Sequence, residues 1–117
     1  MARQLLTYNV RISENTVVSP RIPEEALEEA LTLIRDVIAD GNDDFESCLL
    51  KNPYVKRSQD LFDVLLACRN ENIDPKYAEN RAALNIALQI ARQDRLYEHF
   101  LPEIEDADYR LKFEVNR

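Results

Sequence analysis

Residues 74–93 read DPKYAENRAALNIALQIARQ and contain the longest helical pattern of the chain. Asp74 followed by Pro75 is typical of a helix N-cap and first helical position. The aspartate accepts backbone N–H groups there, and proline has no N–H to satisfy. We expect this helix to run to at least Gln93, with Phe100 as its furthest end before the next proline.

Within this helix, residues 82–91 contain only two polar side chains, Asn85 and Gln89. A helix that is apolar over most of its surface normally packs against two neighbours. Those neighbours either belong to the same chain or include a second copy of it. We therefore consider self-association through helix 76–94 alongside burial within one molecule.

The segment that begins at Pro23 has the period of an amphipathic helix. Proline and the glutamates after it suit a first turn, because carboxylates favour the positive end of the helix dipole. The helix is expected to end near Gly41, since glycine readily adopts the left-handed conformation that terminates helices. Its predicted apolar face comprises Leu27, Leu31, Ile34 and Ile38.

Two further helices are expected between these segments. A short helix that carries Phe45, Cys48 and Leu49 follows capping residues 42–44 and is closed by Pro53. Ser58 then caps a helix in which only Asp63 is polar among residues 61–68. We therefore place helix 58–68 at the centre of the core.

Alternation of apolar and polar residues predicts strands near both ends of the chain. The alternating segments are residues 4–12 and 109–115, and residues 16–19 form a candidate hairpin strand. We expect one domain over residues 1–117 of the α+β class. Its small antiparallel sheet pairs the N- and C-terminal strands and packs against about four helices.

Composition excludes several classes of protein. Gly41 is the only glycine, so the chain has neither a phosphate-binding P-loop nor a dinucleotide-binding loop. The N-terminal residues lack the apolar run of a signal peptide, and no apolar stretch is long enough to span a bilayer. We expect a cytoplasmic protein that has reduced cysteines, no membrane contact and no cofactor.

The net charge of −7 arises mainly from the first half of the chain, where residues 1–55 contain ten acidic and five basic side chains. This charge disfavours binding to nucleic acid and favours a basic protein partner. The candidate partner-binding residues are Glu25, Glu28, Glu29, Asp36, Asp40, Asp43, Asp44 and Glu46.

Side chains suited to chemistry are few. His99 is the only histidine, and we expect Cys48 and Cys68 to pack in the core as small apolar groups. Residues 40–46 do not match a calcium loop, because Phe45 replaces its glycine and Lys51 its final carboxylate. We predict no catalytic residue and no metal site.

A second acidic cluster, residues 103–108, is expected on a solvated loop, with metal binding as the less favoured interpretation. Together with Tyr97 and His99, these carboxylates are the candidates to line a pocket beside the sheet. That pocket defines one of three hypotheses, a small-ligand sensor or an enzyme.

The hypothesis we favour is a non-enzymatic protein-binding module, such as an inhibitor, an immunity or antitoxin protein, or an accessory subunit. It rests on the acidic surface together with the scarcity of catalytic groups. The third hypothesis is a homo-oligomeric scaffold.

Overall fold

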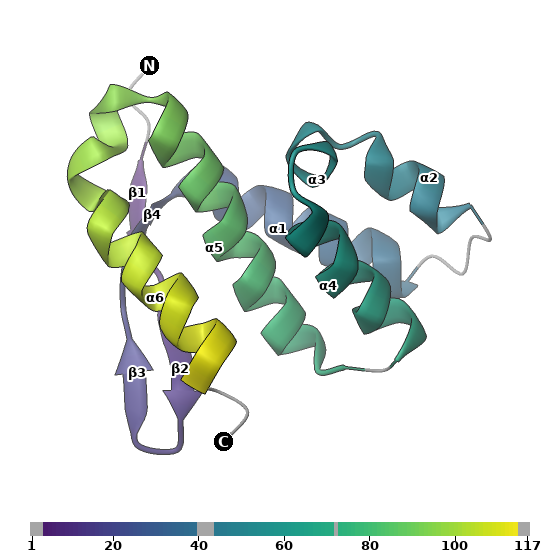
Figure 1. Cartoon of the computed structure of the whole chain (residues 1–117), viewed down its shortest axis with the longest axis horizontal. Helices are drawn as coiled ribbons and strands as arrows, with labels where there is room; N and C mark the ends of the chain where they lie inside the picture. Colours follow the sequence, from purple (N-terminus) through teal and green to yellow (C-terminus); the bar gives the residue numbers. More distant parts are fainter. Residues whose placement is uncertain (1–3, 40–43, 72, 115–117) are drawn as a thin grey trace.

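The computed structural model describes residues 4–39, 44–71 and 73–114, and Figure 1 shows how their helices and strands are arranged. In chain order the elements are β1 (Leu5–Thr7), β2 (Val10–Ser13), β3 (Thr16–Val18), β4 (Arg21–Pro23), α1 (Glu24–Ala39), α2 (Phe45–Leu50), α3 (Pro53–Lys56), α4 (Gln59–Asn70), α5 (Pro75–Gln93), the 3₁₀ helix η1 (Arg95–Phe100) and α6 (Leu101–Glu114). The predicted α+β class is confirmed.

The strands form two small antiparallel sheets that lie one beyond the other in Figure 1. β1 pairs with β4, where Leu6 lies opposite Ile22, and β2 pairs with β3, where Val10 lies opposite Val18. Because the chain passes through β1 and β2 and returns through β3 and β4, the two sheets form one interrupted hairpin.

The interruption of this hairpin lies at Tyr8, whose backbone N–H donates to the carbonyl of Pro20 at 2.8 Å. The strand predicted over residues 4–12 is therefore divided into β1 and β2. The candidate hairpin strand at residues 16–19 is confirmed as β3, which is shorter by one residue.

The predicted C-terminal strand is wrong, because residues 101–114 form the helix α6. Tyr109 and Phe113 are 61% and 54% exposed, whereas Leu111 is 1% exposed. All three would share one face of a strand, but in a helix the residue between two that are four apart points away from both. The sheet consequently pairs N-terminal strands only with one another.

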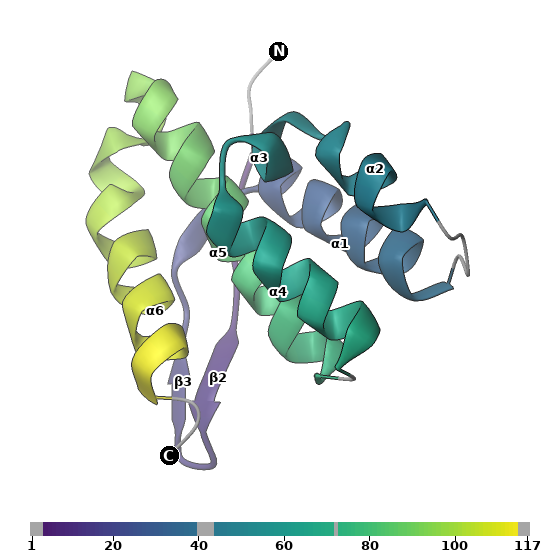
Figure 2. The same ribbon diagram turned by 45° about the vertical axis from the view of Figure 1, so that its right-hand side comes forward.

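The centre of the core is α5, which packs against α1, α4, α6, η1 and β4. Figures 1 and 2 show it between α4 and α6. Its buried residues are Ala78, Asn80, Arg81, Ala82, Ala83, Leu84, Ile86, Ala87, Leu88, Ile90 and Ala91. The helix expected at the centre of the core, 58–68, corresponds to α4. One side of α4 is exposed at Gln59, Asp60 and Asp63, so α4 is not the central helix.

α1 packs most extensively against α5, through a different stripe from the predicted one. Its buried residues are Ala26, Ala30, Leu33 and Val37, whereas Leu31 is exposed and Leu27 and Ile34 are half-buried. Alanine has a short side chain, so it lets two helices approach closely. Gly41 and the side chain of Ile38 lie outside the described residues.

The predicted caps at Ser58 and Asp74 are confirmed, whereas Asp44 occupies the N-cap position of α2 without a side-chain capping hydrogen bond. Ser58 Oγ accepts the Leu61 N–H at 3.1 Å at the start of α4, and Asp74 Oδ1 accepts the Lys76 N–H at 2.9 Å at the start of α5. Asn52 caps α3, so Pro53 begins a helical turn as well as ending the preceding segment.

Candidate functional site

Four of the predicted partner-binding residues lie on one outward face of α1, which we call the acidic face: Glu25, Glu28, Glu29 and Asp36. The helical repeat of about 100° per residue brings these four positions to the same side. Glu29 is half-buried and the other three are exposed. Arg35 is the only basic residue of α1, so this face is strongly negative.

Two carboxylates of the acidic face accept hydrogen bonds from the segment that contains α3. The Tyr54 hydroxyl donates to Glu25 Oε1 at 3.1 Å, and Asn52 Nδ2 donates to Glu29 Oε2 at 3.1 Å. Burial, followed by the Glu25 carboxylate, raises the pKa of Tyr54, which therefore stays protonated. Since both donors are neutral, these contacts hold the carboxylates in place without cancelling their charge.

Ion pairs distinguish the acidic face from the second half of the molecule. Within the described residues, five carboxylates between residues 60 and 108 form ion pairs, namely Asp60, Glu79, Glu103, Glu105 and Asp108, whereas none of the four carboxylates of the acidic face does. Other exposed acids of that half, such as Asp63, Glu98 and Asp106, lie on three different elements. The four carboxylates of the acidic face therefore lie on the same side of one helix, and no described basic side chain forms an ion pair with them.

The remaining predicted partner-binding residues belong to the segment after α1. Asp44 is the N-cap residue of α2 and Glu46 lies in its first turn, and both are exposed. α2 packs against α1, so these two residues belong to an element beside the acidic face. Asp40 and Asp43 lie outside the described residues.

Tyr97 and His99 both belong to η1, but they have different environments. The Tyr97 side chain is buried and His99 is exposed. A 3₁₀ helix turns by about 120° per residue, so side chains two positions apart point in different directions. The structure thus does not bring the two candidate pocket residues together.

The carboxylates of residues 103–108 lie on α6 and not on the predicted loop. Glu103 pairs with Arg21 at 3.1 Å, Glu105 with Arg92 at 3.4 Å, and Asp108 with Lys112 at 3.1 Å. Across residues 4–39, 44–71 and 73–114, no group of three His, Cys, Asp or Glu side chains is placed to hold a metal ion.

The two cysteines differ in exposure. Cys68 is buried as predicted, and burial raises the pKa of its thiol. Cys48 is exposed, so the prediction that it packs in the core is wrong. The reason is that the short helix α2 buries only Leu49.

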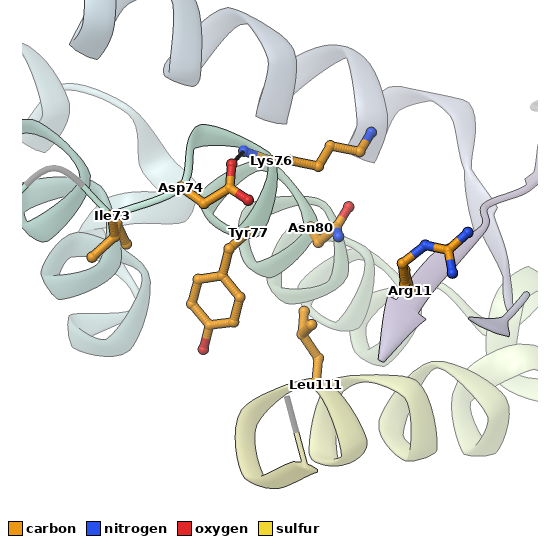
Figure 3. A pocket seen from close by; sticks show the side chains of 7 residues that line it. All are labelled: Arg11, Ile73, Asp74, Lys76, Tyr77, Asn80 and Leu111. Atoms are coloured by element: carbon orange, nitrogen blue, oxygen red, sulfur yellow. Dashed lines mark hydrogen bonds between the residues drawn. The ribbon is translucent and has the colours of Figure 1, made fainter. Parts of the chain in front are cut away.

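A cleft of about 550 Å³ opens between β2, the start of α5 and the end of α6 (Figure 3). Its volume falls within the range of about 300–1,000 Å³ that is usual for small-molecule sites. The residues that line it are Arg11, Ile73, Asp74, Lys76, Tyr77, Asn80 and Leu111. Figure 3 shows Asn80 and Leu111 between Tyr77 on one side and Arg11 on the other.

Asn80 is held in this cleft by a hydrogen-bond network behind it. The Tyr8 hydroxyl lies 2.6 Å from Asn80 Oδ1 and 3.0 Å from Glu79 Oε2, and Lys76 Nζ donates to the same Glu79 oxygen at 2.8 Å. Burial, followed by the Glu79 carboxylate, raises the pKa of Tyr8, so its hydroxyl keeps its proton. The Asn80 side chain is therefore fixed by groups outside the cleft.

Tyr77 is held by a second network. Arg81 Nη1 donates to the Tyr77 hydroxyl at 2.9 Å, and Arg81 Nη2 lies 2.6 Å from each carboxylate oxygen of Asp60. Lys112 Nζ adds a positive charge 3.5 Å from Asp60. These contacts connect α4, α5 and α6 and fix the aromatic ring at the edge of the cleft.

Sequence reasoning did not identify the cleft residues. Arg11 was an outward position of a predicted strand, and Asn80 precedes the apolar stretch of α5 without any motif around it. Their proximity depends on how the N-terminal hairpin packs on α5 and α6. The sequence signal for this cleft was Asn80, a polar residue on the inner side of the largely apolar helix α5.

The fold and its surfaces define a small α+β protein with an acidic face on α1 and a cleft of mixed polar and apolar lining between β2, α5 and α6. Searches with protein-family models, among curated proteins and among solved structures each found no match. Of the helices that the structure describes, none combines the length and the apolar composition needed to cross a bilayer.

Proposed function

We propose that this protein is a binding module that docks the acidic face of α1 on a basic surface of another protein. The observation that carries the proposal is the contrast in ion pairing. The acidic face presents four neighbouring carboxylates without a described counter-charge, whereas five carboxylates between residues 60 and 108 are paired within the molecule. A surface that retains its charge in this way attracts a basic partner.

The expected contribution of this surface is to the rate and selectivity of association. Complementary charge raises association rate constants from about 10⁵–10⁶ M⁻¹s⁻¹ towards 10⁸–10⁹ M⁻¹s⁻¹ at low salt, and salt screens the effect. The net charge of −7 adds a longer-range field of the same sign. The same field repels phosphate backbones, which disfavours nucleic acid as the partner.

Self-association through helix 76–94 receives no such support. The apolar positions of α5 are covered by α1, α4, α6, η1 and β4 of the same chain. The residues that α5 leaves half-buried or exposed beyond its first turns include Asn85, Gln89, Arg92 and Gln93, which are polar. A dimer interface normally has an apolar centre, which this surface lacks.

The test is affinity purification from the native cell, followed by binding kinetics with the purified partner. The variant E25Q/E28Q/E29Q/D36N removes four charges but keeps oxygen acceptors for Tyr54 and Asn52. We expect its association rate constant to fall about tenfold or more at low salt, with a smaller loss at high salt.

The matched control is D63N/E71Q/E98Q/D106N, which removes four charges from exposed positions outside α1. We expect its association rate to stay within about threefold of the wild-type rate, because only the general field changes. Equal losses in the two variants would show that net charge, and not the acidic face, controls binding. Unchanged binding of the α1 variant would refute the proposal.

A further inference from the structure

Figure 3 shows Arg11 and Asn80 towards one end of the cleft, and Ile73 and Tyr77, with Asp74 beside them, towards the other. Arg11 and Asn80 provide nitrogen donors at one end, while the ring of Tyr77 and the side chains of Ile73 and Leu111 provide apolar surface. Small-molecule sites typically combine apolar walls with a few fixed polar groups that orient the ligand. A ligand that matches this cleft has one polar group and an apolar body.

Asn80 supplies an amide donor. The residue is 5% exposed, its Oδ1 lies 2.6 Å from the Tyr8 hydroxyl, and the described residues accept no hydrogen bond from its Nδ2. Nδ2 is not among the described buried atoms that lack a partner, so it borders the open space of the cleft, where water solvates it. A ligand oxygen that replaces this water keeps the amide hydrogen-bonded.

Arg11 supplies a cation. Its Nη1 donates to the backbone carbonyl of Glu14 at 3.1 Å, and in the described part of the chain no carboxylate pairs with its guanidinium. Lys76 pairs with Glu79 at 2.8 Å, so its charge is compensated. Asp74 accepts the Lys76 backbone N–H as the cap of α5 and keeps its negative charge, but Figure 3 places it beside Ile73 and Tyr77, on the far side of Asn80 from Arg11. The uncompensated charge at the Arg11 end of the cleft is thus positive.

The apolar end is fixed before any ligand arrives. The Tyr77 hydroxyl accepts a hydrogen bond from Arg81, which Asp60 holds in turn, and Leu111 is buried at the base of the cleft. A preorganised wall reduces the entropy lost on binding. Tyr77 and Leu111 line the same cleft, so an apolar body placed there contacts both side chains.

We propose that this cleft binds a small organic carboxylate, whose carboxyl group contacts Arg11 and Asn80 and whose apolar body lies against Tyr77, Ile73 and Leu111. A carboxylate matches the planar donors of arginine and an amide, which can engage both of its oxygens. The volume of about 550 Å³ admits a molecule of metabolite size. This binding is independent of the acidic face and needs no protein partner.

The experiment is an NMR titration of the purified, ¹⁵N-labelled full chain with 3-phenylpropanoate at up to about 10 mM, since small fragments bind in the millimolar range. Two probes serve as controls: 3-phenylpropanamide, which lacks the charge, and acetate, which lacks the apolar body. We expect 3-phenylpropanoate to shift the side-chain amide signals of Asn80 and the backbone signals near Tyr77. Each control should bind at least about tenfold more weakly.

Two variants localise the binding. R11Q removes an exposed cation, so the fold should persist, and it should weaken 3-phenylpropanoate binding about tenfold while affecting the amide little. N80D keeps an acceptor for Tyr8 but replaces the donor with a second carboxylate, and it should abolish binding. Thermal unfolding of each variant checks that the fold is retained.

The proposal is overturned if 3-phenylpropanoate causes no shifts, if the shifts map outside the cleft, or if R11Q binds it as tightly as the wild type. It is also overturned if the amide binds as well as the carboxylate. None of these results bears on binding through the acidic face, because the titration contains no partner protein.

Discussion

Removing the Asp60 carboxylate should destabilise the fold more than removing the Arg81 guanidinium. The Arg81 side chain is 10% exposed, while Asp60 is 47% exposed, and Nη2 of the arginine contacts both Asp60 oxygens at 2.6 Å. In D60A a nearly buried cation loses its anionic partner. In R81M the carboxylate that remains is half-exposed, so water can solvate it.

The magnitude follows from these exposures. A hydrogen bond to a charged group contributes about 1.5–3 kcal/mol when it is well shielded, and the half-exposed carboxylate places this pair at the lower end. We therefore expect D60A to lower the free energy of unfolding by about 1.5–2 kcal/mol. R81M keeps most of the packing volume of the side chain and should cost about 1 kcal/mol or less.

Urea denaturation followed by circular dichroism measures both changes. With an m-value of about 1.5 kcal/mol per molar urea, typical of a chain of this size, D60A should lower the midpoint by about 1 M. E105A, which breaks the exposed pair with Arg92, is the control and should cost about 0.5 kcal/mol or less. If R81M proves more destabilising than D60A, the asymmetry argued from burial is refuted.

Three further outcomes are expected. L111A should lower the free energy of unfolding by about 2–5 kcal/mol and F113A by less than about 0.5 kcal/mol, because the helical conformation of α6 buries Leu111 and leaves Phe113 exposed. Similar losses for the two variants in urea denaturation would contradict this assignment. Because Cys48 is exposed and Cys68 is buried, a thiol reagent should modify Cys48 in the native protein and Cys68 only after unfolding. The reaction is followed by absorbance, and equal reaction rates for the two thiols in the native protein would contradict this prediction. Burial alone would raise the pKa of Asp60, but Arg81 and Lys112 lower it below its ordinary value of 3.8. This carboxylate therefore stabilises the fold above about pH 4, and the stabilisation is lost as the pH falls through the lowered pKa, so D60A should show a shallower acid transition than the wild type.

The C-terminal segment shows why part of the fold could not be read from the sequence. Residues 109–115 alternate between apolar and polar, which favours a strand when the segment is taken alone. The helical face of α6 contains Ile104, Ala107, Asp108 and Leu111, all buried, and the aspartate interrupts its apolar pattern. Asp108 is tolerated there because Lys112 pairs with it within the same helix. The sequence of this segment fits both the two-residue period of a strand and the period of a helix. Packing against α5 selects the helix.

The candidate sites were predictable to different degrees. The grouping of Glu25, Glu28, Glu29 and Asp36 follows from helix geometry, which the local sequence specifies. Whether their charges are compensated depends on which bases lie nearby in space, and this could not be inferred from the sequence. The cleft was not predicted at all, because its walls come from β2, α5 and α6, which are far apart in the chain.

The sequence by itself determined the α+β class, the extended segments within residues 4–12 and 16–19, and the helix starts at Ser58 and Asp74, but not the strand β4. These features depend on hydrogen bonds and side-chain periods within a few residues of one another. The tertiary structure decided that α5 is the core helix, that α1 packs through Ala26 and Ala30, and that residues 101–114 are helical. Those outcomes depend on the free energy of burying side chains against elements that are distant in the sequence. Local sequence patterns do not report this free energy.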